Sequence, residues 1–200
     1  MLADVVAPVG YAVRGGALAT DLRRYKSERC DAAEAALAAA RLRALLSGFL
    51  AGHGAEVWRA AGMPAGPSAV AVVPSGQGRP GAHPLARLVG DCVGLPLVRL
   101  SLRPGEIHTR GVNPGWVQVH TPVAGGGILV VDDTWVSGGS AQSTAAALKL
   151  AGACRVAIMV LGRHVNPDDP RSAAFRHAAG KEFSAWCPPG PGPFVLRAGQ

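Results

Sequence analysis

Two adjacent aspartates followed by a short Gly- and Ser-rich segment carry the strongest chemical signal in this 200-residue chain. Asp132 and Asp133 directly follow an apolar run, residues 128–131, which has the length of a buried strand. The segment 137–140 reads Ser, Gly, Gly, Ser and lies where the next helix is predicted to begin. Backbone N–H groups at a helix N-terminus bind anions, glycine permits close approach of the backbone, and serine hydroxyls add donors. We therefore expect a phosphate at this turn.

The acidic pair indicates what the phosphate is attached to. Two carboxylates would repel a phosphate at contact distance, but they accept hydrogen bonds from sugar hydroxyls. Asp132 and Asp133 together with the 137–140 turn therefore predict a phosphosugar site. The structural alternative is that aspartate forms the turn and serine caps the helix, because both are common at strand-to-helix turns.

The elements around this segment predict a single α/β domain. An Ala- and Leu-rich helix is expected over residues 31–51, ending before Gly52. Two strand–helix–strand units follow, with predicted elements at 69–73, 85–93 and 97–100, then 128–131, 141–151 and 156–161. Such units form a mainly parallel sheet with right-handed crossovers, and ligands collect at the carboxyl ends of its strands. The Gly-rich segments 74–81 and 137–140 both lie at such ends.

Three further segments could contribute to the site. The polar and basic stretch 22–28 precedes the long helix and is either a solvated turn or a ligand arm. The segment 103–115 reads as an exposed loop or short hairpin ahead of residues 116–120. Residues 162–169 follow a predicted strand end, so they either border an acceptor pocket or form an ordinary turn.

Composition favours an anionic small ligand. Twenty Lys and Arg against 13 Asp and Glu give a net charge of +7, and arginine suits bidentate contacts with phosphate. The basic residues are scattered and no run of alternating basic and aromatic residues occurs, which argues against nucleic acid. The four cysteines are far apart and the six histidines lack metal-ligand spacing, so no protein-bound metal is expected. With no signal pattern and no membrane segment predicted, we expect a cytoplasmic protein.

Residues 128–140 resemble the motif of type I phosphoribosyltransferases that binds 5-phosphoribosyl 1-pyrophosphate (PRPP). That motif has a hydrophobic strand, two acidic residues, three variable positions, and then Ser or Thr, Gly, any residue, and Ser or Thr. The resemblance implies that Asp132 and Asp133 hold the ribose 2′ and 3′ hydroxyls. It implies that the 5′-phosphate is cradled by Thr134 and by Ser137, Gly138, Gly139 and Ser140, with Trp135 and Val136 in the variable part.

The resemblance also implies an architecture. We expect one phosphoribosyltransferase-like domain over residues 1–200, with a mainly parallel central sheet flanked by helices and a small irregular hood. Residues 186–200 form a Pro-rich C-terminal tail. Trp135 is unusual within the motif, and it either stacks on an acceptor ring or packs the loop against the domain.

The wider layout over residues 11–161 is similar to the ComF-type branch. By this resemblance, the pyrophosphate loop consists of Ser75, Gly76, Gln77, Gly78 and Arg79. A mobile loop spans residues 103–110, and the cations for the leaving group are Lys26, Arg79, Arg103 and Arg110. The chain departs from the branch in lacking an N-terminal cysteine-rich zinc segment and an Arg-Gly-Phe-Asn sequence after the pyrophosphate loop, so a role in competence is not transferred.

The implied activity is transfer of the phosphoribosyl group to a nitrogen acceptor, a nucleobase or small amine, with release of pyrophosphate. Mg²⁺ accompanies PRPP, Asp132 or Asp133 serves as a proton acceptor, and the family implies a homodimer in nucleotide metabolism. Two alternatives remain. One is a catalytically inactive PRPP-sensing module, which the atypical segment 76–84 keeps open. The other is an unrelated phosphate-binding domain, although a receiver-like domain carries its acidic pair after an early strand.

Overall fold

The structure is a computed structural model that describes residues 1–75, 83–104, 111–169 and 196–197. Its helices are α1 (Ala17–Arg24), α2 (Ala32–Ala60), α3 (Pro84–Val93) and α4 (Gly139–Leu150), with one short 3-10 turn, η1 (Pro114–Trp116). Its strands are β1 (Val5–Pro8), β2 (Tyr11–Val13), β3 (Ala69–Val72), β4 (Leu97–Val98), β5 (Leu100–Leu102), β6 (Val117–Val119), β7 (Gly127–Trp135), β8 (Arg155–Val165) and β9 (Leu196–Arg197). The Pro-rich tail otherwise lies outside the described residues.

The central sheet is mainly parallel, as the sequence predicts. Its strand order is β4-β3-β7-β8-β1-β9, and β2 pairs with β8 beyond the end of β1. All neighbouring strands are parallel except β9, which runs antiparallel to β1. The units β3-α3-β4 and β7-α4-β8 are the two predicted strand–helix–strand units. The sequence analysis missed β1 and β2, which are short and lack a strong alternating pattern.

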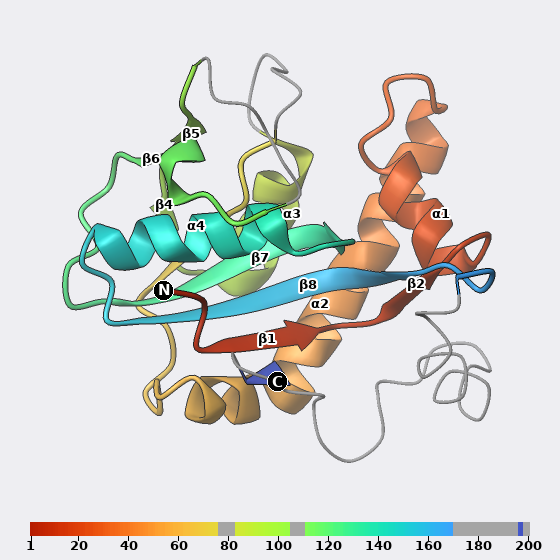
Figure 1. Cartoon of the computed structure of the whole chain (residues 1–200). Coiled ribbons are helices and arrows are strands. Elements are labelled where there is room, and N and C mark those ends of the chain that lie inside the picture. Colours follow the sequence, from red (N-terminus) through yellow and green to blue (C-terminus); the bar gives the residue numbers. More distant parts are fainter. Residues whose placement is uncertain (76–82, 105–110, 170–195, 198–200) are drawn as a thin grey trace.

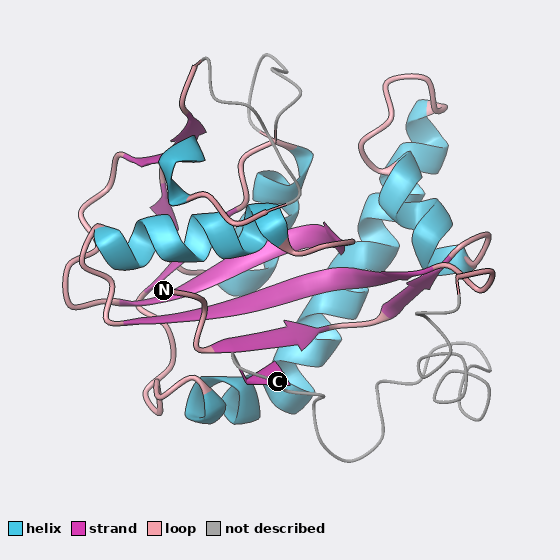
Figure 2. Cartoon of the chain, viewed as in Figure 1, coloured by secondary structure: helices cyan, strands magenta, loops and turns pink. Residues whose placement is uncertain are grey.

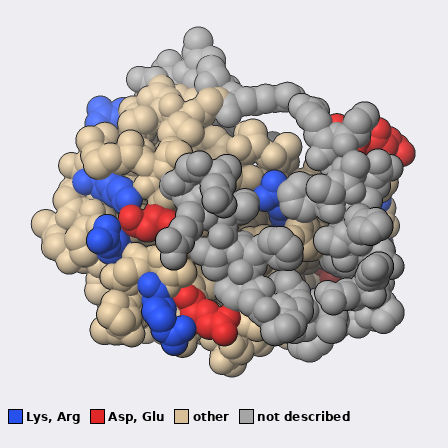
Figure 3. Space-filling model, turned by 60° about the horizontal axis from the view of Figure 1, so that its bottom comes forward, with Lys and Arg blue, Asp and Glu red and all other residues tan. Residues whose placement is uncertain are grey.

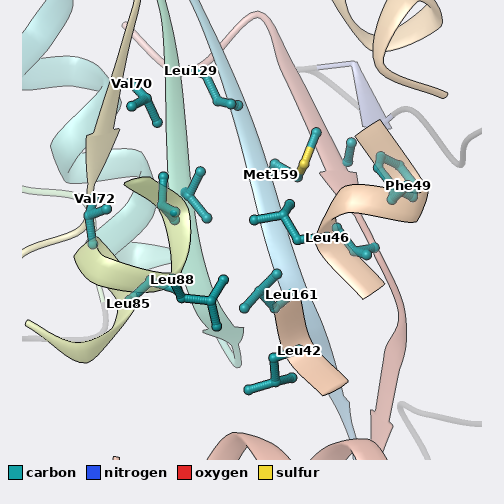
Figure 4. Packing of buried hydrophobic residues seen from close by; sticks show 14 of the residues in the cluster. Leu42, Leu46, Phe49, Val70, Val72, Leu85, Leu88, Leu129, Met159 and Leu161 are labelled. Carbon is teal, nitrogen blue, oxygen red and sulfur yellow. The ribbon is translucent and has the colours of Figure 1, made fainter. Parts of the chain in front are cut away.

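Helices cover both faces of this sheet (Figures 1 and 2). On one face, α1, α2 and α3 pack on inward-pointing residues of β3, β7 and β8, and Figure 4 shows Leu42, Leu46 and Phe49 from α2 meeting Met159 and Leu161. On the other face, α4 packs its alanines and Leu148 against β7 and β8. The carboxyl ends of β7 and β8 lie together beside α1 (Figure 1).

Helix α2 is longer than the sequence predicts. Asp31 caps its N-terminus by accepting the N–H groups of Ala33 and Glu34, at 2.8 and 3.3 Å. The predicted end at Gly52 is wrong, because the helix runs on to Ala60. Buried Val57 anchors the added turns, and packing outweighs the cost of about 1 kcal/mol for a glycine inside a helix.

The same helix is long and apolar enough to cross a membrane by length and composition alone. A core helix of a soluble fold passes that test too, and α2 buries Leu42, Leu46, Phe49 and Val57 against the sheet. Only 22% of its apolar window is buried, and a single helix of this kind is weak evidence for a membrane span.

Strands β7 and β8 also extend beyond their predicted ends. The sequence predicts that the first of them stops at residue 131, yet β7 continues to Trp135 while β8 continues to Val165. Pairing across the extension joins Asp132 to Val160 and Trp135 to Arg163. The acidic pair thus lies within a strand and not in a turn, because pairing with β8 overrides the low strand propensity of aspartate.

Charged side chains on the described surface are mixed in sign. On the face shown in Figure 3, Lys and Arg side chains lie next to Asp and Glu side chains. The ion pairs of the described residues include Arg43 with Asp91, Lys149 with Asp4, and Arg155 with Asp4. This mixture agrees with the scattered basic residues of the sequence.

Candidate functional site

The segment that joins β7 to α4 is shaped by one glycine and one tryptophan. Gly138 has φ +78°, in the left-handed region that favours glycine. A Cβ built on Gly138 would lie 2.1 Å from Cζ2 of Trp135, so the indole lies directly over this glycine. Of the two roles left open for Trp135, the structure supports packing on the loop. Val136 between them is 72% exposed and makes the rim of the turn.

The N-terminus of α4 faces this turn without a side-chain cap. Gly138 occupies the cap position and has no side chain to offer, and α4 begins at Gly139. Ser137 Oγ accepts the N–H of Gly139 at a long 3.4 Å, while Ser140 is exposed. Glycine at the cap position therefore offers no side-chain acceptor to the N–H groups of the first turn, and the helix dipole favours an anion there.

Asp133 is a buried carboxylate surrounded by donors. Its Oδ2 accepts the hydroxyl of Tyr25 at 2.6 Å and Nζ of Lys26 at 2.7 Å, and the Thr134 hydroxyl also bonds to the carboxylate. Burial by itself raises the pKa of Asp133, but the Lys26 charge and these three hydrogen bonds outweigh it and hold the pKa below its ordinary value. Asp133 is therefore ionised at neutral pH.

Asp132 has the opposite electrostatic environment. Its Oδ1 accepts the N–H of Asp133 at 2.9 Å, and its carboxylate also accepts the backbone N–H of Thr134. Burial and then the neighbouring Asp133 charge raise the pKa of Asp132 to about 7, although Lys26 and the backbone donors oppose the shift. The two adjacent aspartates thus differ in charge near neutral pH.

This raised pKa predicts a pH-dependent stability. The folded protein binds the Asp132 proton more tightly than the unfolded chain, in which the aspartate carboxyl has its ordinary pKa of 3.8. The contribution is thus present below that value and is lost as pH rises to about 7, at up to about 1.4 kcal/mol per pH unit. Urea unfolding at several pH values should show that Asp132→Asn loses less free energy of unfolding than the wild type over this window. The stability of the variant relative to the wild type should therefore increase as pH rises. Parallel stability curves for the two proteins would contradict the raised pKa.

The other predicted loops begin beside the acidic pair or near α4. Strand β3 ends next to β7, where the N–H of Val73 donates to the carbonyl of Val131 at 3.1 Å, and the chain then leaves through Pro74 to exposed Ser75. The rest of the predicted pyrophosphate loop, Gly76, Gln77, Gly78 and Arg79, lies outside the described residues, as does Arg110.

The predicted mobile loop starts from the β5–β6 hairpin. Exposed Arg103 donates its N–H to the carbonyl of Trp116 at 2.7 Å. On the other side of the loop, the N–H of Asn113 donates to Ser143 Oγ at 2.9 Å, and that hydroxyl donates to the carbonyl of Gly139 at 2.6 Å. A single serine of α4 therefore connects the base of this loop to the first turn of α4.

The structure adds residues that the sequence analysis did not select. The sequence analysis assigns no site role to Tyr25, which lies within the polar stretch 22–28, yet its hydroxyl donates to Oδ2 of Asp133. Lys26 is predicted to contact the leaving group, but in the structure its Nζ lies 2.7 Å from Oδ2 of Asp133. The solvated-turn alternative for residues 22–28 is wrong at these two positions, because Tyr25 is buried and Lys26 is 32% exposed and ion-paired.

A second group of side chains lies beyond the acidic pair, closer to the carboxyl ends of the strands. Tyr11 of β2, Arg163 of β8 and Trp135 of β7 stand at the same level of register on three adjacent strands. Burial raises the pKa of Tyr11 and lowers that of Arg163, and each of the two opposes the other's shift electrostatically. Two segments that the sequence left open, Trp135 and 162–169, therefore meet at this level, together with a tyrosine on a strand that was not predicted.

The described residues contain no group of three or more His, Cys, Asp and Glu side chains arranged to hold a metal ion. Asp132 and Asp133 are two carboxylates, and Lys26 is already bound to one of them.

No protein-family model matches the chain, and no curated protein matches it. Among solved structures, adenine phosphoribosyltransferase from Leishmania tarentolae is 13% identical, with 86% of this chain and 85% of that chain covered and a TM-score of 0.44. Orotate phosphoribosyltransferase from Mycobacterium tuberculosis in complex with PRPP is 22% identical, with 74% and 86% covered and a TM-score of 0.40. Phosphoribosylpyrophosphate synthetase from Mycobacterium smegmatis is 24% identical, with 68% of this chain but only 36% of the synthetase covered and a TM-score of 0.39.

Proposed function

We propose that this chain is a cytoplasmic phosphoribosyltransferase of nucleotide metabolism, which binds PRPP and transfers its 5-phosphoribosyl group to a nitrogen acceptor. One observation carries the proposal: an acidic pair and an uncapped helix N-terminus lie in consecutive segments at the carboxyl edge of a parallel sheet. An anion site and a diol site so close together fit a phosphorylated sugar. The motif resemblance, including its ComF-type form, points to the same ligand.

Each part of the site has a distinct task in this proposal. The first turn of α4, with Ser137 and Ser140, binds the 5′-phosphate, while Asp132 and Asp133 accept the ribose hydroxyls. The Thr134 hydroxyl bonds to Asp133, which supports a role in orienting that carboxylate. Ser75 begins the loop proposed for pyrophosphate, and Arg103 begins the loop proposed to close over it.

The chemistry is electrostatic and needs no covalent enzyme intermediate. As the bond between C1 and pyrophosphate breaks, positive charge grows on the ribose ring and negative charge on the leaving group. Carboxylates beside the ribose and arginines in the closing loop stabilise these charges, and closure excludes the water that would hydrolyse PRPP. Mg²⁺ enters as part of the substrate, where it neutralises pyrophosphate oxygens.

The acceptor side is proposed at Arg163 and Tyr11, beyond the acidic pair along β8 and β2. A planar nitrogen heterocycle or a small amine reaching this level would approach the ribose from the open carboxyl edge. Arg163 supplies donors for a carbonyl or carboxylate substituent, and the Tyr11 ring supplies an apolar face. A homodimer is part of the family expectation and is tested by the mass of the protein in solution.

Calorimetric titration with PRPP and Mg²⁺ tests the proposal, followed by pyrophosphate release over a panel of nucleobases and amines. We expect saturable binding by the wild type, none by Asp132→Asn/Asp133→Asn, and release that depends on one acceptor class. Titration with ribose 5-phosphate checks the phosphate turn and the acidic pair separately from the pyrophosphate loop, since this ligand lacks pyrophosphate.

The outcomes separate the alternatives. Binding of PRPP without release for any acceptor favours the PRPP-sensing module, which needs the phosphate and ribose contacts but no complete pyrophosphate loop. Folded wild type that binds neither PRPP nor ribose 5-phosphate rules out the phosphosugar site itself. Circular dichroism of each variant shows that a lost signal does not come from unfolding.

A further inference from the structure

Tyr25 and Lys26 approach the acidic pair from a distant part of the chain. They follow α1 directly, and they are separated from Asp133 by 108 and 107 residues in sequence. Both donors meet a single oxygen, Oδ2 of Asp133, at 2.6 Å from the tyrosine hydroxyl and 2.7 Å from the lysine ammonium. Lys26 Nζ also lies 5.9 Å from the centre of the Tyr25 ring, so the two side chains support each other.

These contacts make the two aspartates chemically unequal. The charge of Asp133 is compensated by Lys26, and the Asp133 side chain is only 12% exposed. Asp132 has no ion pair within 4 Å among the described residues, and its carboxylate accepts the backbone N–H groups of Asp133 and Thr134. The charged and titratable groups that act on Asp132 are Asp133 and Lys26, and Tyr25 acts through its bond to Asp133.

We propose that Tyr25 and Lys26 are positioning residues for ribose recognition, which hold Asp133 as a fixed ionised acceptor and leave Asp132 to exchange a proton when the sugar binds. This inference rests on the proposed PRPP site. It moves Lys26 from the leaving group, where the resemblance placed it, to the ribose. It also divides the acidic pair into two roles that the motif alone does not distinguish.

The proton exchange follows because each of the two ribose hydroxyls needs a hydrogen-bond acceptor. Tyr25 and Lys26 both bond to Oδ2 of Asp133, and the Thr134 hydroxyl also bonds to this carboxylate. Because a carboxylate has about four acceptor positions, Asp133 can still accept one ribose hydroxyl, and an ionised Asp132 accepts the other. A protonated Asp132 has one acceptor position fewer and competes as a donor. Binding below neutral pH therefore releases the Asp132 proton to the buffer, and affinity falls as the solution becomes more acidic.

Two measurements on the full chain test this, one without ligand and one with PRPP. Carboxyl ¹³C NMR of the free protein follows the titration of both aspartates. Calorimetry with PRPP and Mg²⁺ then follows Kd from about pH 6 to 9, where affinity in the wild type should fall by up to tenfold per pH unit below the Asp132 titration. Because the phosphates of PRPP titrate in the same way with every variant, differences between variants belong to the protein.

In Lys26→Met, both aspartates lose their nearby cation and share one proton over a higher pH range. We expect the midpoint of Asp132 and the onset of tight PRPP binding to move up together by about one pH unit. Lys26→Arg keeps the charge and should restore the wild-type profile. Tyr25→Phe removes one hydrogen bond and no charge. It should therefore shift the Asp132 titration curve and the curve of PRPP affinity against pH in the same direction as Lys26→Met, but by less.

Lys149→Met is the matched control, because Lys149 forms a similarly buried pair with Asp4, at 3.0 Å, at the amino end of the sheet. It should leave both curves unchanged. If Lys26→Met and Tyr25→Phe show the wild-type Asp132 titration and the wild-type dependence of PRPP affinity on pH, the positioning role is wrong, although the proposed PRPP binding is not. If the free aspartates titrate as expected but the wild type does not bind PRPP, the proposed function fails and the ribose role fails with it. Should Lys26→Met not fold, Tyr25→Phe and Lys26→Arg still decide the outcome.

Discussion

Replacing Asp133 with asparagine is expected to weaken PRPP binding about 100-fold, which corresponds to about 3 kcal/mol. The amide removes the negative charge that faces Lys26 and Tyr25, and it turns one acceptor oxygen into a donor. Lys26 is then left beside the ribose as an uncompensated cation, and charge-assisted hydrogen bonds contribute about 1.5–3 kcal/mol each. Calorimetry with PRPP and Mg²⁺ measures the loss directly.

Asp4→Asn provides the control for this change. Asp4 is also a partly buried carboxylate, paired with Lys149 at 3.0 Å and bonded to the N–H of Val156 at 2.7 Å, but it lies at the amino end of the sheet. This variant should lose stability in urea unfolding and keep the wild-type affinity for PRPP. Equal affinity of Asp133→Asn and the wild type would remove Asp133 from the ribose site.

Replacing Gly138 with alanine is expected to abolish binding of the 5′-phosphate and to destabilise the fold. The left-handed φ of +78° costs a non-glycine residue roughly 1–3 kcal/mol. In addition, the new methyl would lie 2.1 Å from the indole of Trp135, which must move and release the turn before α4. Titration with ribose 5-phosphate and urea unfolding measure the two effects.

Two further variants, Gly52→Ala and the double variant Gly138→Ala/Trp135→Ala, separate the effect of the strained φ from that of the steric clash with Trp135. Gly52 lies inside α2 with no atom within 4 Å of an added Cβ, so its replacement by alanine should stabilise the helix by roughly 0.5–1 kcal/mol. Adding Trp135→Ala to Gly138→Ala removes the steric clash but keeps the strained φ, and we expect only part of the stability and affinity to return. Full recovery in the double variant would show that the backbone conformation is unimportant.

The sequence alone predicted the parallel strands β3, β4, β7 and β8 of the central sheet, although not β1 and β2, and it predicted a phosphosugar turn after β7. The apolar runs of β3, β7 and β8 and the alternation of strands with helices predict the parallel sheet, because buried parallel strands are apolar on both faces. The adjacent aspartates and the Ser-Gly-Gly-Ser turn predict the phosphosugar site, because all of its groups lie within nine consecutive residues, 132–140. Local chemistry of this kind needs no knowledge of distant contacts.

Only the tertiary structure showed which distant residues meet this segment. Tyr25 and Lys26 reach Asp133 across more than 100 residues, and their stretch read equally as solvent-exposed because its composition is polar. Tyr11 and Arg163 meet at one register level because β2 pairs with β8, a pairing that the three residues of β2 do not reveal. The sequence by itself therefore predicted the ligand class and the turn proposed to bind its phosphate, since these predictions depend on neighbours in the chain. The unequal charges of Asp132 and Asp133 depend on burial and on a lysine brought in by α1, so the folded structure alone decided them.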